Sequence, residues 1–262
     1  SVNNVRSLPV QHYMDGERVV KDESVAAETL IHITVNGETL VNLLGSPEDS
    51  VELAKGHLMT QFSIDFNDIL SVDTSSVNGA VEVAVSIRSQ TVLAQRDGIV
   101  TTSCGACDQD QLDALTKGVP SVANPDRLFD LEHIIEHLNN LRKEQVGFQK
   151  TGGMHAAGLL DMNGKTIVME DIGRHNAVDK AYGAWHQHAN APADVLLLSG
   201  RCGWDIVAKA AAMGTPIIAS FGAASSLAAE TARASNMTLI SFVKGNKAVI
   251  IGPVEGRFQR KH

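Results

Sequence analysis

Short segments with an apolar residue at every second position recur in the first third of the chain, and this alternation predicts half-buried β-strands. Residues 31–35 alternate in this way, Asn36-Gly37 follows as a two-residue turn signal, and residues 40–43 supply a partner strand. Residues 81–87 repeat the alternation, with Val or Ile at every second position. The first part of the chain is therefore predicted to be rich in strands.

Two helices are predicted from the residues at which they would begin. Ser46-Pro47-Glu48 combines a hydroxyl that can cap a helix, a proline suited to the first helical position and an acid in the first turn. This pattern predicts a helix over residues 46–61. Asp130 is suited to cap a second helix, in which apolar residues recur at helical spacing on one face: Leu131, Ile134, Ile135, Leu138 and Leu141.

From residue 151 onward, apolar runs alternate with helical stretches. The runs over residues 154–160 and 166–172 are joined by Asn163-Gly164, which is a hairpin signal. Further strands are predicted over 195–198, 216–220, 238–243 and 248–251, and helices over 176–188, 204–213 and 226–234. Because short loops separate these elements, the alternation predicts a parallel sheet covered by helices on both faces.

The distribution of charge separates two parts of the chain. The whole chain of 262 residues has a formal net charge of −8, which argues against a general nucleic-acid binder. Residues 1–124 hold 7 Lys and Arg against 17 Asp and Glu, whereas residues 125–262 hold 15 against 13. We therefore expect a β-rich N-terminal domain over 1–124 and an α/β domain over 125–262, and the second is the better host for an anionic ligand.

Cysteine content and hydropathy predict the compartment. Three cysteines do not make a disulfide framework in a chain of this length, and the first residues have no long apolar stretch typical of a signal peptide. Residues 208–232 are the least polar region, but Gly214 and Pro216 interrupt them, so we expect no membrane span. A cytoplasmic protein follows, with thiols that are free, metal-bound or catalytic.

Cys104 and Cys107 form a C-x-x-C motif ahead of a helical stretch over residues 110–117. Three kinds of site use this spacing: half of a zinc site, a dithiol redox pair, and a reactive thiolate on a flexible loop. Zinc needs two more ligands, and the sequence has no second C-x-x-C. A thioredoxin-like dithiol lies early in a βαβ domain, not between two domains. A loop-borne nucleophile fits best, since a helix N-terminus lowers a thiol pKa, although Asp108 and Asp110 act the other way.

Two glycine-bearing turns follow predicted strands and open predicted helices. The first contains Gly173, Arg174 and His175, and the second contains Gly200 and Arg201. Glycine lets backbone N–H groups approach an anion, and the arginine side chain donates two parallel hydrogen bonds to phosphate. Neither turn is a complete G-x-G-x-x-G or P-loop motif. Two such turns at the ends of neighbouring strands nevertheless favour an anionic ligand there.

Three other features receive no chemical assignment. Cys202 stands alone after a strand, where a single cysteine is usually a packing residue. His155 is followed by Ala157 where zinc deaminases have glutamate, and the C-x-x-C lies upstream, so deaminase chemistry is not expected. The sequence His133-Ile134-Ile135-Glu136-His137 matches an inverted zinc-protease pattern, but a solvated polar helix face explains it without a metal.

Uncommon motifs follow one another along the chain from about residue 28. They are SCGAC at 103–107, TGGMHAAGL at 151–159, EDIGRHNAVDKAYG at 170–183, LLLSGR at 196–201, and SLAAETA to SFVKGNK over 226–247. With these motifs in this order, the chain resembles the formate dehydrogenase accessory sulfurtransferase family, FdhD.

The resemblance implies a sulfur carrier, an enzyme of the sulfurtransferase class that is required for formate dehydrogenase activity. A cysteine desulfurase would pass persulfide sulfur to Cys104, with Cys107 beside it. The sulfur would then move to the metal of the molybdenum bis(molybdopterin guanine dinucleotide) cofactor before the cofactor enters formate dehydrogenase. The resemblance also implies a homodimer and a three-layer α/β/α C-terminal domain that is cytidine-deaminase-like, beside the smaller β-rich α+β domain.

The resemblance implies that the domain over 125–262 binds this cofactor, partly through one short stretch: Phe242, Val243, Lys244, Gly245, Asn246 and Lys247. Within it, Gly245-Asn246 is a turn signal flanked by lysines that could meet phosphate. Arg174, His175 and Arg201 of the glycine-bearing turns complete the expected cofactor-binding set. No resident metal, nucleic acid or membrane is expected as a partner.

Two other classes of function compete with the sulfur carrier. A thiol–disulfide oxidoreductase would use Cys104 and Cys107 as a dithiol and would form a stable internal disulfide. A non-catalytic nucleotide-binding chaperone would keep its affinity for the cofactor after both cysteines are removed.

Overall fold

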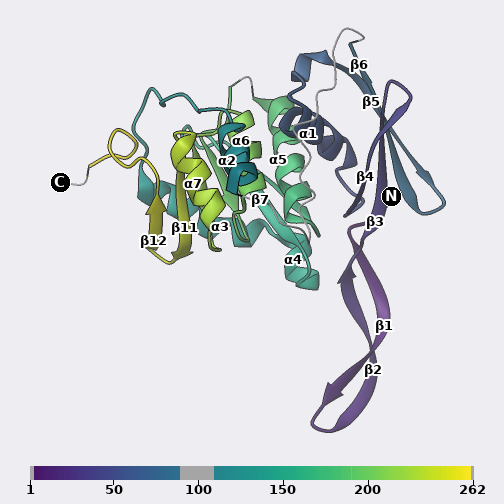
Figure 1. Cartoon of the computed structure of the whole chain (residues 1–262). Helices are drawn as coiled ribbons and strands as arrows, with labels where there is room; N and C mark the ends of the chain where they lie inside the picture. Colours follow the sequence, from purple (N-terminus) through teal and green to yellow (C-terminus); the bar gives the residue numbers. More distant parts are fainter. Residues whose placement is uncertain (1–2, 89–108, 190, 261–262) are drawn as a thin grey trace.

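The computed structural model describes residues 3–88, 109–189 and 191–260, and Figure 1 shows how their helices and strands are arranged. The described chain begins with a long hairpin that projects away from the rest of the molecule (Figure 1). Strands β1 (Val5–Met14) and β2 (Glu17–Ala26) pair along their whole length in antiparallel register. Asp15 and Gly16 connect them with φ values of 51° and 90°, as a tight hairpin turn requires.

A four-stranded sheet in the order β4-β3-β6-β5 follows, and one helix covers its inner face. The elements are β3 (Thr29–Val35), β4 (Glu38–Gly45), α1 (Ser50–Phe62), the short 3-10 helix η1 (Phe66–Asp68), β5 (Ile69–Val77) and β6 (Ala80–Ile87). The predicted hairpin at Asn36-Gly37 and the predicted strand over 81–87 are confirmed. Alternate strand positions and α1 supply one core, which includes Ile31, Ile33, Leu53, Leu58 and Val83.

The predicted start of the helix over 46–61 is wrong by four residues. Helix α1 begins at Ser50, after Asp49 in a left-handed conformation with a φ of 58°. The hydroxyl of Ser46 instead accepts a hydrogen bond of 3.0 Å from the backbone N–H of Ile172, far along the chain. A tertiary contact therefore uses the side chain that the local pattern assigns to a helix cap.

The second part of the chain forms a six-stranded sheet in the order β12-β11-β10-β9-β7-β8. Its strands are β7 (His155–Leu160), β8 (Thr166–Asp171), β9 (Val195–Leu198), β10 (Ile217–Ser220), β11 (Thr238–Lys244) and β12 (Lys247–Ile251). Strands β9, β10 and β11 are parallel, whereas β7 is antiparallel to β8 and β9, and β12 is antiparallel to β11. The expectation of a parallel sheet is therefore wrong outside β9, β10 and β11. The hairpin predicted at Asn163-Gly164 is confirmed, because β7 and β8 pair antiparallel on either side of it.

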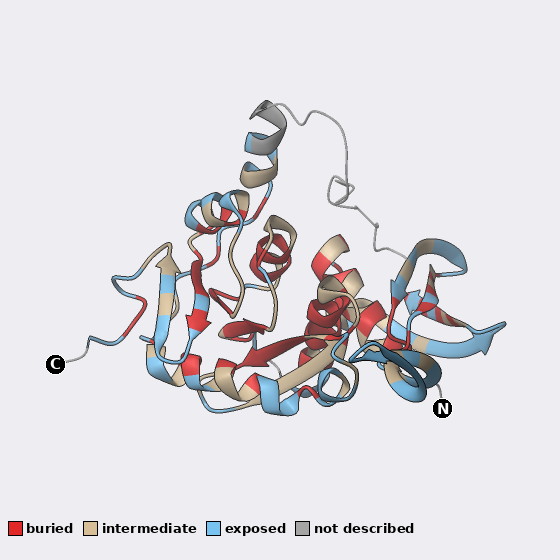
Figure 2. Cartoon of the chain, turned by 90° about the horizontal axis from the view of Figure 1, so that it is seen from below, coloured by how far each residue is buried: buried red, intermediate tan, exposed pale blue. Residues whose placement is uncertain are grey.

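Helices lie on both faces of this sheet. They are α2 (Gln109–Lys117), α3 (Leu131–Glu144), α4 (Val146–Thr151), α5 (Arg174–His188), α6 (Trp204–Ala212) and α7 (Ser226–Ala234). Leu196 and Leu198 of β9 pack with α5, α6 and α7, whereas Val195 and Leu197 pack with α3. Both faces of the sheet are thus covered, and Figure 2 shows buried residues gathered in the sheet and on the helices that face it. This explains the unbroken apolar run over 195–198.

The chain therefore has a mixed α/β fold with several sheets, as expected. The likeness to cytidine deaminases and the division at residue 124 stay predictions. Val119 and Val122, which precede that boundary, pack in the core between the six-stranded sheet and α5 to α7. None of the described helices is long and apolar enough to cross a membrane.

A buried ion-pair network joins α1 to the helices of the second sheet. Asp179 of α5 is buried, and the ammonium of Lys209 on α6 lies 2.7 and 2.9 Å from its two carboxylate oxygens. Thr60 of α1 donates to the same carboxylate at 2.7 Å, and Nδ1 of His57 lies 3.0 Å from it. Burial alone would raise the pKa of Asp179, but the charge of Lys209 and the hydrogen bond from His57 outweigh it and lower the pKa well below its usual value.

A second buried ion pair ties the end of β8 to the segment that follows β4. Nζ of Lys180 lies 2.8 Å from Oδ2 of Asp171, and both side chains are fully buried. Lys180 also donates to the carbonyl oxygens of Ser46 and Glu48 at 3.0 and 2.7 Å, while Asp171 accepts from the N–H of Ser46 at 3.0 Å. These contacts give the charged residues of the motif over 170–183 a structural role between the two sheets.

Glycine is required where α1 crosses α5. A Cβ atom on Gly56 would lie 1.7 Å from the carbonyl oxygen of Asp179, and one on Gly183 would lie 2.0 Å from the carbonyl oxygen of Glu52. Any side chain at either position would push the helices apart. The close crossing brings Thr60 and His57 within reach of Asp179.

We expect the substitution Asp179→Asn to lower the free energy of unfolding by about 3–5 kcal/mol, because it leaves the buried Lys209 without its counter-charge. Chemical denaturation followed by circular dichroism measures this change. The control is Asp68→Asn, which removes the partly exposed surface ion pair of Asp68 with Arg88 at 3.4 Å and is expected to cost less than about 1 kcal/mol. Similar losses for both variants would contradict a dominant role for the buried network.

Candidate functional site

Five segments meet at one edge of the six-stranded sheet. Strands β8, β9, β10 and β11 all end there, and the antiparallel strand β7 begins there. We call this the carboxyl edge, and it consists of His155 and residues 171–175, 199–201, 221–222 and 242–247. Ligands of α/β proteins collect at such an edge, because the loops beyond the strands carry most of the variable side chains. The predicted cofactor-binding residues all lie along it.

The turn that contains Arg174 and His175 is fixed from both sides. Asp171 accepts a hydrogen bond of 2.8 Å from the N–H of Gly173, and α5 begins at the next residue. The imidazole Nε2 of His175 pairs with the carboxylate of Asp205 in the first turn of α6. Burial would raise the pKa of Asp205, but the hydrogen bond and charge of His175, the backbone hydrogen bond from Ile206 and the charge of Arg174 together outweigh it and lower the pKa. Nε of Arg174 is buried and has no hydrogen-bond partner among the described residues.

His155 begins β7 and stands directly opposite Asp171 on β8. Its ring lies against Gly200, since a Cβ atom at that glycine would be 3.2 Å from Nδ1 of His155. Burial lowers the pKa of His155, and the nearby charges of Arg174, His175 and Arg201 lower it further. His155 is therefore expected to be neutral at pH 7, with cations around it. No local pattern assigns His155 to this site, because only the antiparallel pairing of β7 brings it to the edge.

Arg201 is exposed in the turn that follows β9, and Gly222 packs against that turn. The N–H of Gly222 donates to the carbonyl of Gly200 at 3.3 Å, and the N–H of Phe242 donates to the carbonyl of Gly222 at 3.1 Å. A Cβ atom on Gly222 would lie 2.7 Å from the backbone N of Arg201. Glycine at 222 therefore connects the turn of Arg201 to the hairpin that follows β11.

The predicted stretch over 242–247 spans the end of β11, the hairpin turn and the start of β12. Phe242 is 55% exposed and has a φ of 54°, an uncommon backbone for an aromatic residue. Val243 is buried and its side chain packs in the core, so only its backbone can meet a ligand. The other members are exposed: Lys244, Gly245, Asn246 and Lys247.

The structure gathers the predicted residues along a line and does not place them around one point. Arg174, His175 and Arg201 are close enough to His155 for their charges to act on its ring. The hairpin over 242–247 lies farther along the edge, since four strand spacings of about 4.8 Å give roughly 19 Å between β8 and β11. The edge thus suits an extended anion better than a single phosphate.

A cavity of about 750 Å³ opens on the α3 side of this edge. Its walls include His155 and Ser199 from the edge, and Arg142, Phe148 and Phe221. The guanidinium of Arg142 lies over the ring of Phe221, 4.2 Å from its centroid. Sequence reasoning missed Phe221, Arg142 and Asp205, because each lies in an element whose own pattern is ordinary and only the packing brings them here.

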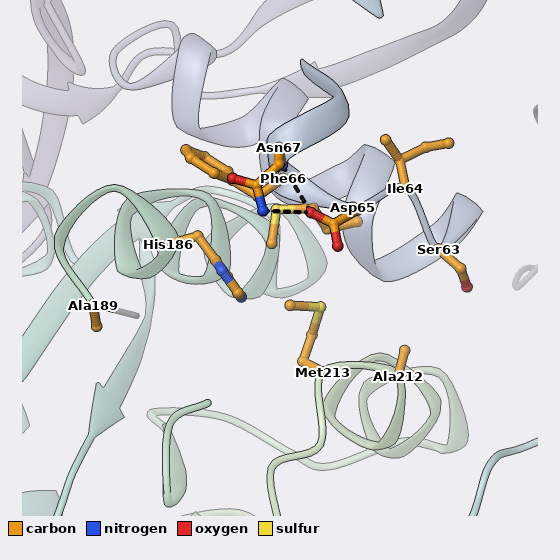
Figure 3. A pocket seen from close by; sticks show the side chains of 10 residues that line it. Ser63, Ile64, Asp65, Phe66, Asn67, His186, Ala189, Ala212 and Met213 are labelled. Carbon is orange, nitrogen blue, oxygen red and sulfur yellow. Dashed lines mark hydrogen bonds between the residues drawn. The ribbon is translucent and has the colours of Figure 1, made fainter. Parts of the chain in front are cut away.

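A second cavity, of about 550 Å³, lies at the other ends of α5 and α6 (Figure 3). His186 and Met213 point into it, and Asp65 at its rim accepts hydrogen bonds from Asn67. Phe66 stacks on His186 with ring centroids 5.9 Å apart. Because α5 separates His186 from Arg174 by most of its length, this cavity does not belong to the carboxyl edge.

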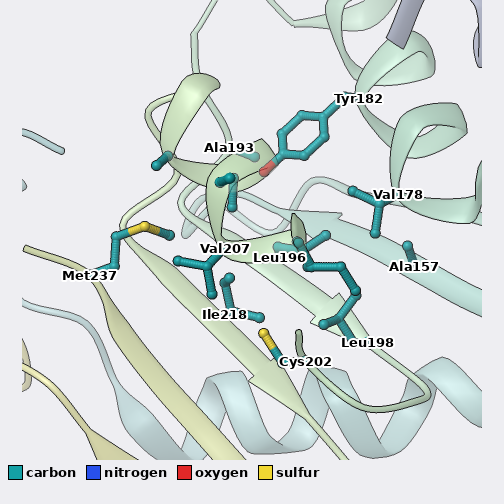
Figure 4. Packing of buried hydrophobic residues seen from close by; sticks show 14 of the residues in the cluster. Ala157, Val178, Tyr182, Ala193, Leu196, Leu198, Cys202, Val207, Ile218 and Met237 are labelled. Atoms are coloured by element: carbon teal, nitrogen blue, oxygen red, sulfur yellow. The ribbon is translucent and has the colours of Figure 1, made fainter. Parts of the chain in front are cut away.

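Cys104 and Cys107 lie outside the described residues, so their predicted roles are not tested. Cys202 is buried, and Figure 4 shows it among Leu198, Val207 and Ile218. Burial raises the pKa of its thiol to about 12. Cys202 is therefore an unreactive packing residue.

The histidines of the inverted zinc-protease pattern contact one another on the surface of α3. The rings of His133 and His137 have centroids 4.4 Å apart in a T-shaped arrangement. In the part of the chain that the structure describes, no group of three or more His, Cys, Asp and Glu side chains could hold a metal ion.

The model of the FdhD/NarQ family matches residues 26–255 of this chain. The chain belongs to the FdhD/NarQ family. The sulfur carrier protein FdhD of Streptomyces coelicolor is 33% identical over 248 residues, which cover 88% of both chains. The sulfur carrier protein FdhD of Sulfolobus acidocaldarius is 34% identical over 245 residues, covering 92% of this chain and 94% of the relative. The family expected from the sequence motifs is thereby confirmed.

The fold of this FdhD/NarQ chain also occurs in a solved structure. A crystal structure from Desulfotalea psychrophila, described as a formate dehydrogenase accessory protein, aligns with a TM-score of 0.78 and 23% identity. The alignment covers 98% of this chain and 100% of the other. At this identity, the likeness shows a shared fold.

We expect the imidazole of His155 in this FdhD/NarQ protein to titrate below pH 6.5, and its pKa to rise in Arg174→Gln and in Arg201→Gln. Removal of a nearby cation makes the protonated ring less unfavourable, which is the reason for the rise. A two-dimensional NMR titration of the histidine rings measures the pKa of His155 in the unmodified protein and in each variant. The control is Arg233→Gln at the end of α7, which should leave the pKa unchanged. If neither edge arginine has an effect, the cations do not act on His155.

Proposed function

We propose that this protein is a sulfur carrier that serves formate dehydrogenase. It accepts persulfide sulfur on Cys104 and passes it to the metal of the molybdenum bis(molybdopterin guanine dinucleotide) cofactor, before the cofactor enters the enzyme. The observation that carries the proposal is the row of cationic side chains along one sheet edge, in a family member that also bears a C-x-x-C motif. The names of its relatives support the sulfur-carrier part of the proposal.

The first step transfers sulfur from a cysteine desulfurase to Cys104. The thiolate of Cys104 attacks the outer sulfur of the donor's persulfide, the donor's S–S bond breaks, and the donor cysteine leaves as a thiolate with the electron pair. Cys104 now carries the outer sulfur, and the exchange needs no oxidant or reductant. Cys107 lies close in sequence and can assist by thiol exchange, at the risk of releasing the sulfur as sulfide.

The second step transfers the outer sulfur from Cys104 to the metal of the bound cofactor. The S–S bond on Cys104 breaks, the Cys104 thiolate is regenerated, and the metal is oxidised by two electrons as it takes up the sulfur. The acceptor carries four phosphate groups, which need cations and N–H donors. Arg174, with an unpartnered buried Nε, and the exposed Arg201, Lys244 and Lys247 supply such donors along the carboxyl edge.

The acceptor is long enough to use the whole edge. A cofactor with two pterin-dinucleotide arms is an extended polyanion, and roughly 19 Å separates the ends of the row, from four strand spacings. The fit between an extended ligand and a linear array of donors supports this acceptor over a mononucleotide. A cytoplasmic location, where free thiols persist, is part of the proposal.

A thiol–disulfide oxidoreductase is the less favoured function. It would use the same two cysteines, but it would not explain why cationic side chains surround His155. The names of the relatives also favour sulfur transfer.

Incubation with a cysteine desulfurase and cysteine is expected to add the mass of one sulfur atom per chain. The added mass should be lost in Cys104→Ala, which removes the proposed sulfur acceptor. It should be kept in Cys202→Ala, because the thiol of Cys202 is buried and its pKa is raised. Intact-protein mass spectrometry, with and without a reductant, reads out both results. A stable internal disulfide together with reductase activity on small disulfides would identify the oxidoreductase instead.

Guanosine diphosphate, as a probe for one arm of the cofactor, is expected to bind more tightly than adenosine diphosphate. Arg201→Gln should weaken this binding about tenfold, because one charge-assisted hydrogen bond contributes about 1.5–3 kcal/mol. Isothermal titration calorimetry measures the affinities, and Arg233→Gln at the end of α7 serves as the matched control. Equally weak binding of both nucleotides would count against the proposed acceptor.

A further inference from the structure

The cavity of about 550 Å³ at the far ends of α5 and α6 lies between the two parts of the molecule, and we call it the junction cavity. Met59, Asp65 and Phe66 line it from α1 and the segment after α1, whereas His186 and Met213 line it from the ends of α5 and α6. A volume of roughly 300–1,000 Å³ is typical of sites for small organic molecules. The sulfur-carrier function leaves this cavity without a role.

Three helices end at the junction cavity. Met59 lies in the last turn of α1, His186 lies in the last turn of α5, and Ala212 is the last residue of α6. The carboxyl end of a helix carries a partial negative charge, which favours a cation beside it. The last turn of α1 has no basic residue, and the ammonium of Lys209 near the end of α6 is paired with Asp179. The helix ends therefore favour a positively charged ligand.

Asp65 adds a full negative charge that is held in position. Its Oδ1 accepts hydrogen bonds from the backbone N–H and the side-chain amide of Asn67, at 2.8 and 3.0 Å. Its Oδ2 has no hydrogen-bond partner among the described residues. The ammonium of Lys55 lies 5.6 Å from the ring centroid of Phe66, but Lys55 does not line the cavity. One oxygen of a fixed carboxylate is thus free to accept from a ligand.

His186 supplies a second acceptor. Burial lowers the pKa of its imidazole, although the charge of Asp65 opposes this change, so the ring is expected to be neutral at pH 7 with one nitrogen free to accept. Phe66 stacks on the ring with centroids 5.9 Å apart, and Figure 3 shows the ring pointing into the cavity. No hydrogen bond or ion pair joins His186 to Asp65, both of which the structure describes. A donor placed between them could therefore bind both.

The other walls suit an aromatic body better than a bare metal ion. Met59 is buried and Met213 is half-buried, and a thioether sulfur makes favourable contacts with aromatic rings. Ala212 has a small side chain and leaves the space in front of it open. Hard divalent cations take about six or more oxygen ligands, whereas Asp65 is the single acid among the described residues that line the cavity.

We propose that the junction cavity binds a small aromatic amine in its protonated form. The ammonium group donates to Oδ2 of Asp65 and to the ring of His186, and the aromatic body packs against Met59, Phe66 and Met213. A carboxylate ligand would be repelled by Asp65 and by the helix ends. Because the bound molecule contacts both parts of the chain, it would stabilise their junction. The proposal goes beyond the sulfur-carrier function and does not depend on it.

Benzylamine, which is protonated at pH 7, is the probe. Its binding to the full chain is expected to shift the ring NMR signals of His186 and to leave those of His133 on α3 unchanged. Benzyl alcohol has the same ring without the charge and should bind at least about tenfold more weakly, because it lacks the charge-assisted hydrogen bond. Asp65→Asn should weaken the binding of benzylamine about tenfold for the same reason. Asparagine caps a helix as well as aspartate does, so this variant should stay folded.

Two further variants complete the test. Asp68→Asn removes an acid from the same short helix, but Asp68 does not line the cavity, so its affinity for benzylamine should equal that of the unmodified chain. Ala212→Leu fills the cavity without removing a polar group and should prevent binding, with circular dichroism to check that it is folded. Absence of binding, equal binding of benzyl alcohol, or unchanged affinity in a folded Asp65→Asn would overturn the proposal. Magnesium chloride that shifts the His186 signals when benzylamine does not would identify a metal site instead.

Discussion

The buried carboxylate of Asp179 gathers charged and polar contacts from both parts of the molecule. It lies where water is excluded, so it requires the ammonium of Lys209 and the hydrogen bonds from His57 and Thr60 to remain charged. Lys209 belongs to the layer on the six-stranded sheet, whereas His57 and Thr60 belong to the helix of the four-stranded sheet. Separation of the two parts would leave an unpaired charge in an apolar interior. The network therefore fixes the orientation of one sheet relative to the other.

The same contacts prepare the carboxyl edge. Asp171 binds Lys180 and the segment after β4, and it also accepts a hydrogen bond from Gly173, in the turn that presents Arg174 and His175. The backbone of this turn is thus held in place before any ligand arrives. A fixed turn loses less conformational entropy on binding than a free loop. The motif over 170–183 combines both tasks, since Asp171, Asp179 and Lys180 are buried between the two sheets and Arg174 lies at the edge.

Much of the fold could be predicted from local patterns. The alternation over 81–87, the capped helix after Asp130 and the apolar run over 195–198 all correspond to observed elements. Asp130 caps its helix because both partners of that hydrogen bond lie within three residues. Ser46 fits the same local pattern but does not cap a helix. Its hydroxyl instead accepts a hydrogen bond from the backbone N–H of Ile172, which follows a strand of the other sheet. Arg174, His175 and Arg201 lie at the edge where the sequence predicts them, and their role as donors stays a prediction. Asp205 and Phe221 were not predicted, since nothing in their own segments distinguishes them.

Local patterns along the chain were enough to predict the helices, most of the strands and the family to which the chain belongs. Helices, strands and motifs depend on residues that are close together in the chain. Hydrophobic periodicity and motif spacing therefore indicate them directly. Only the folded chain shows the pairing of β7 with β9, the partners of Asp179 and Asp171, and the position of His155 beside Arg201. Those features join residues that are far apart in the chain, and local periodicity carries no information about which distant segments pack together.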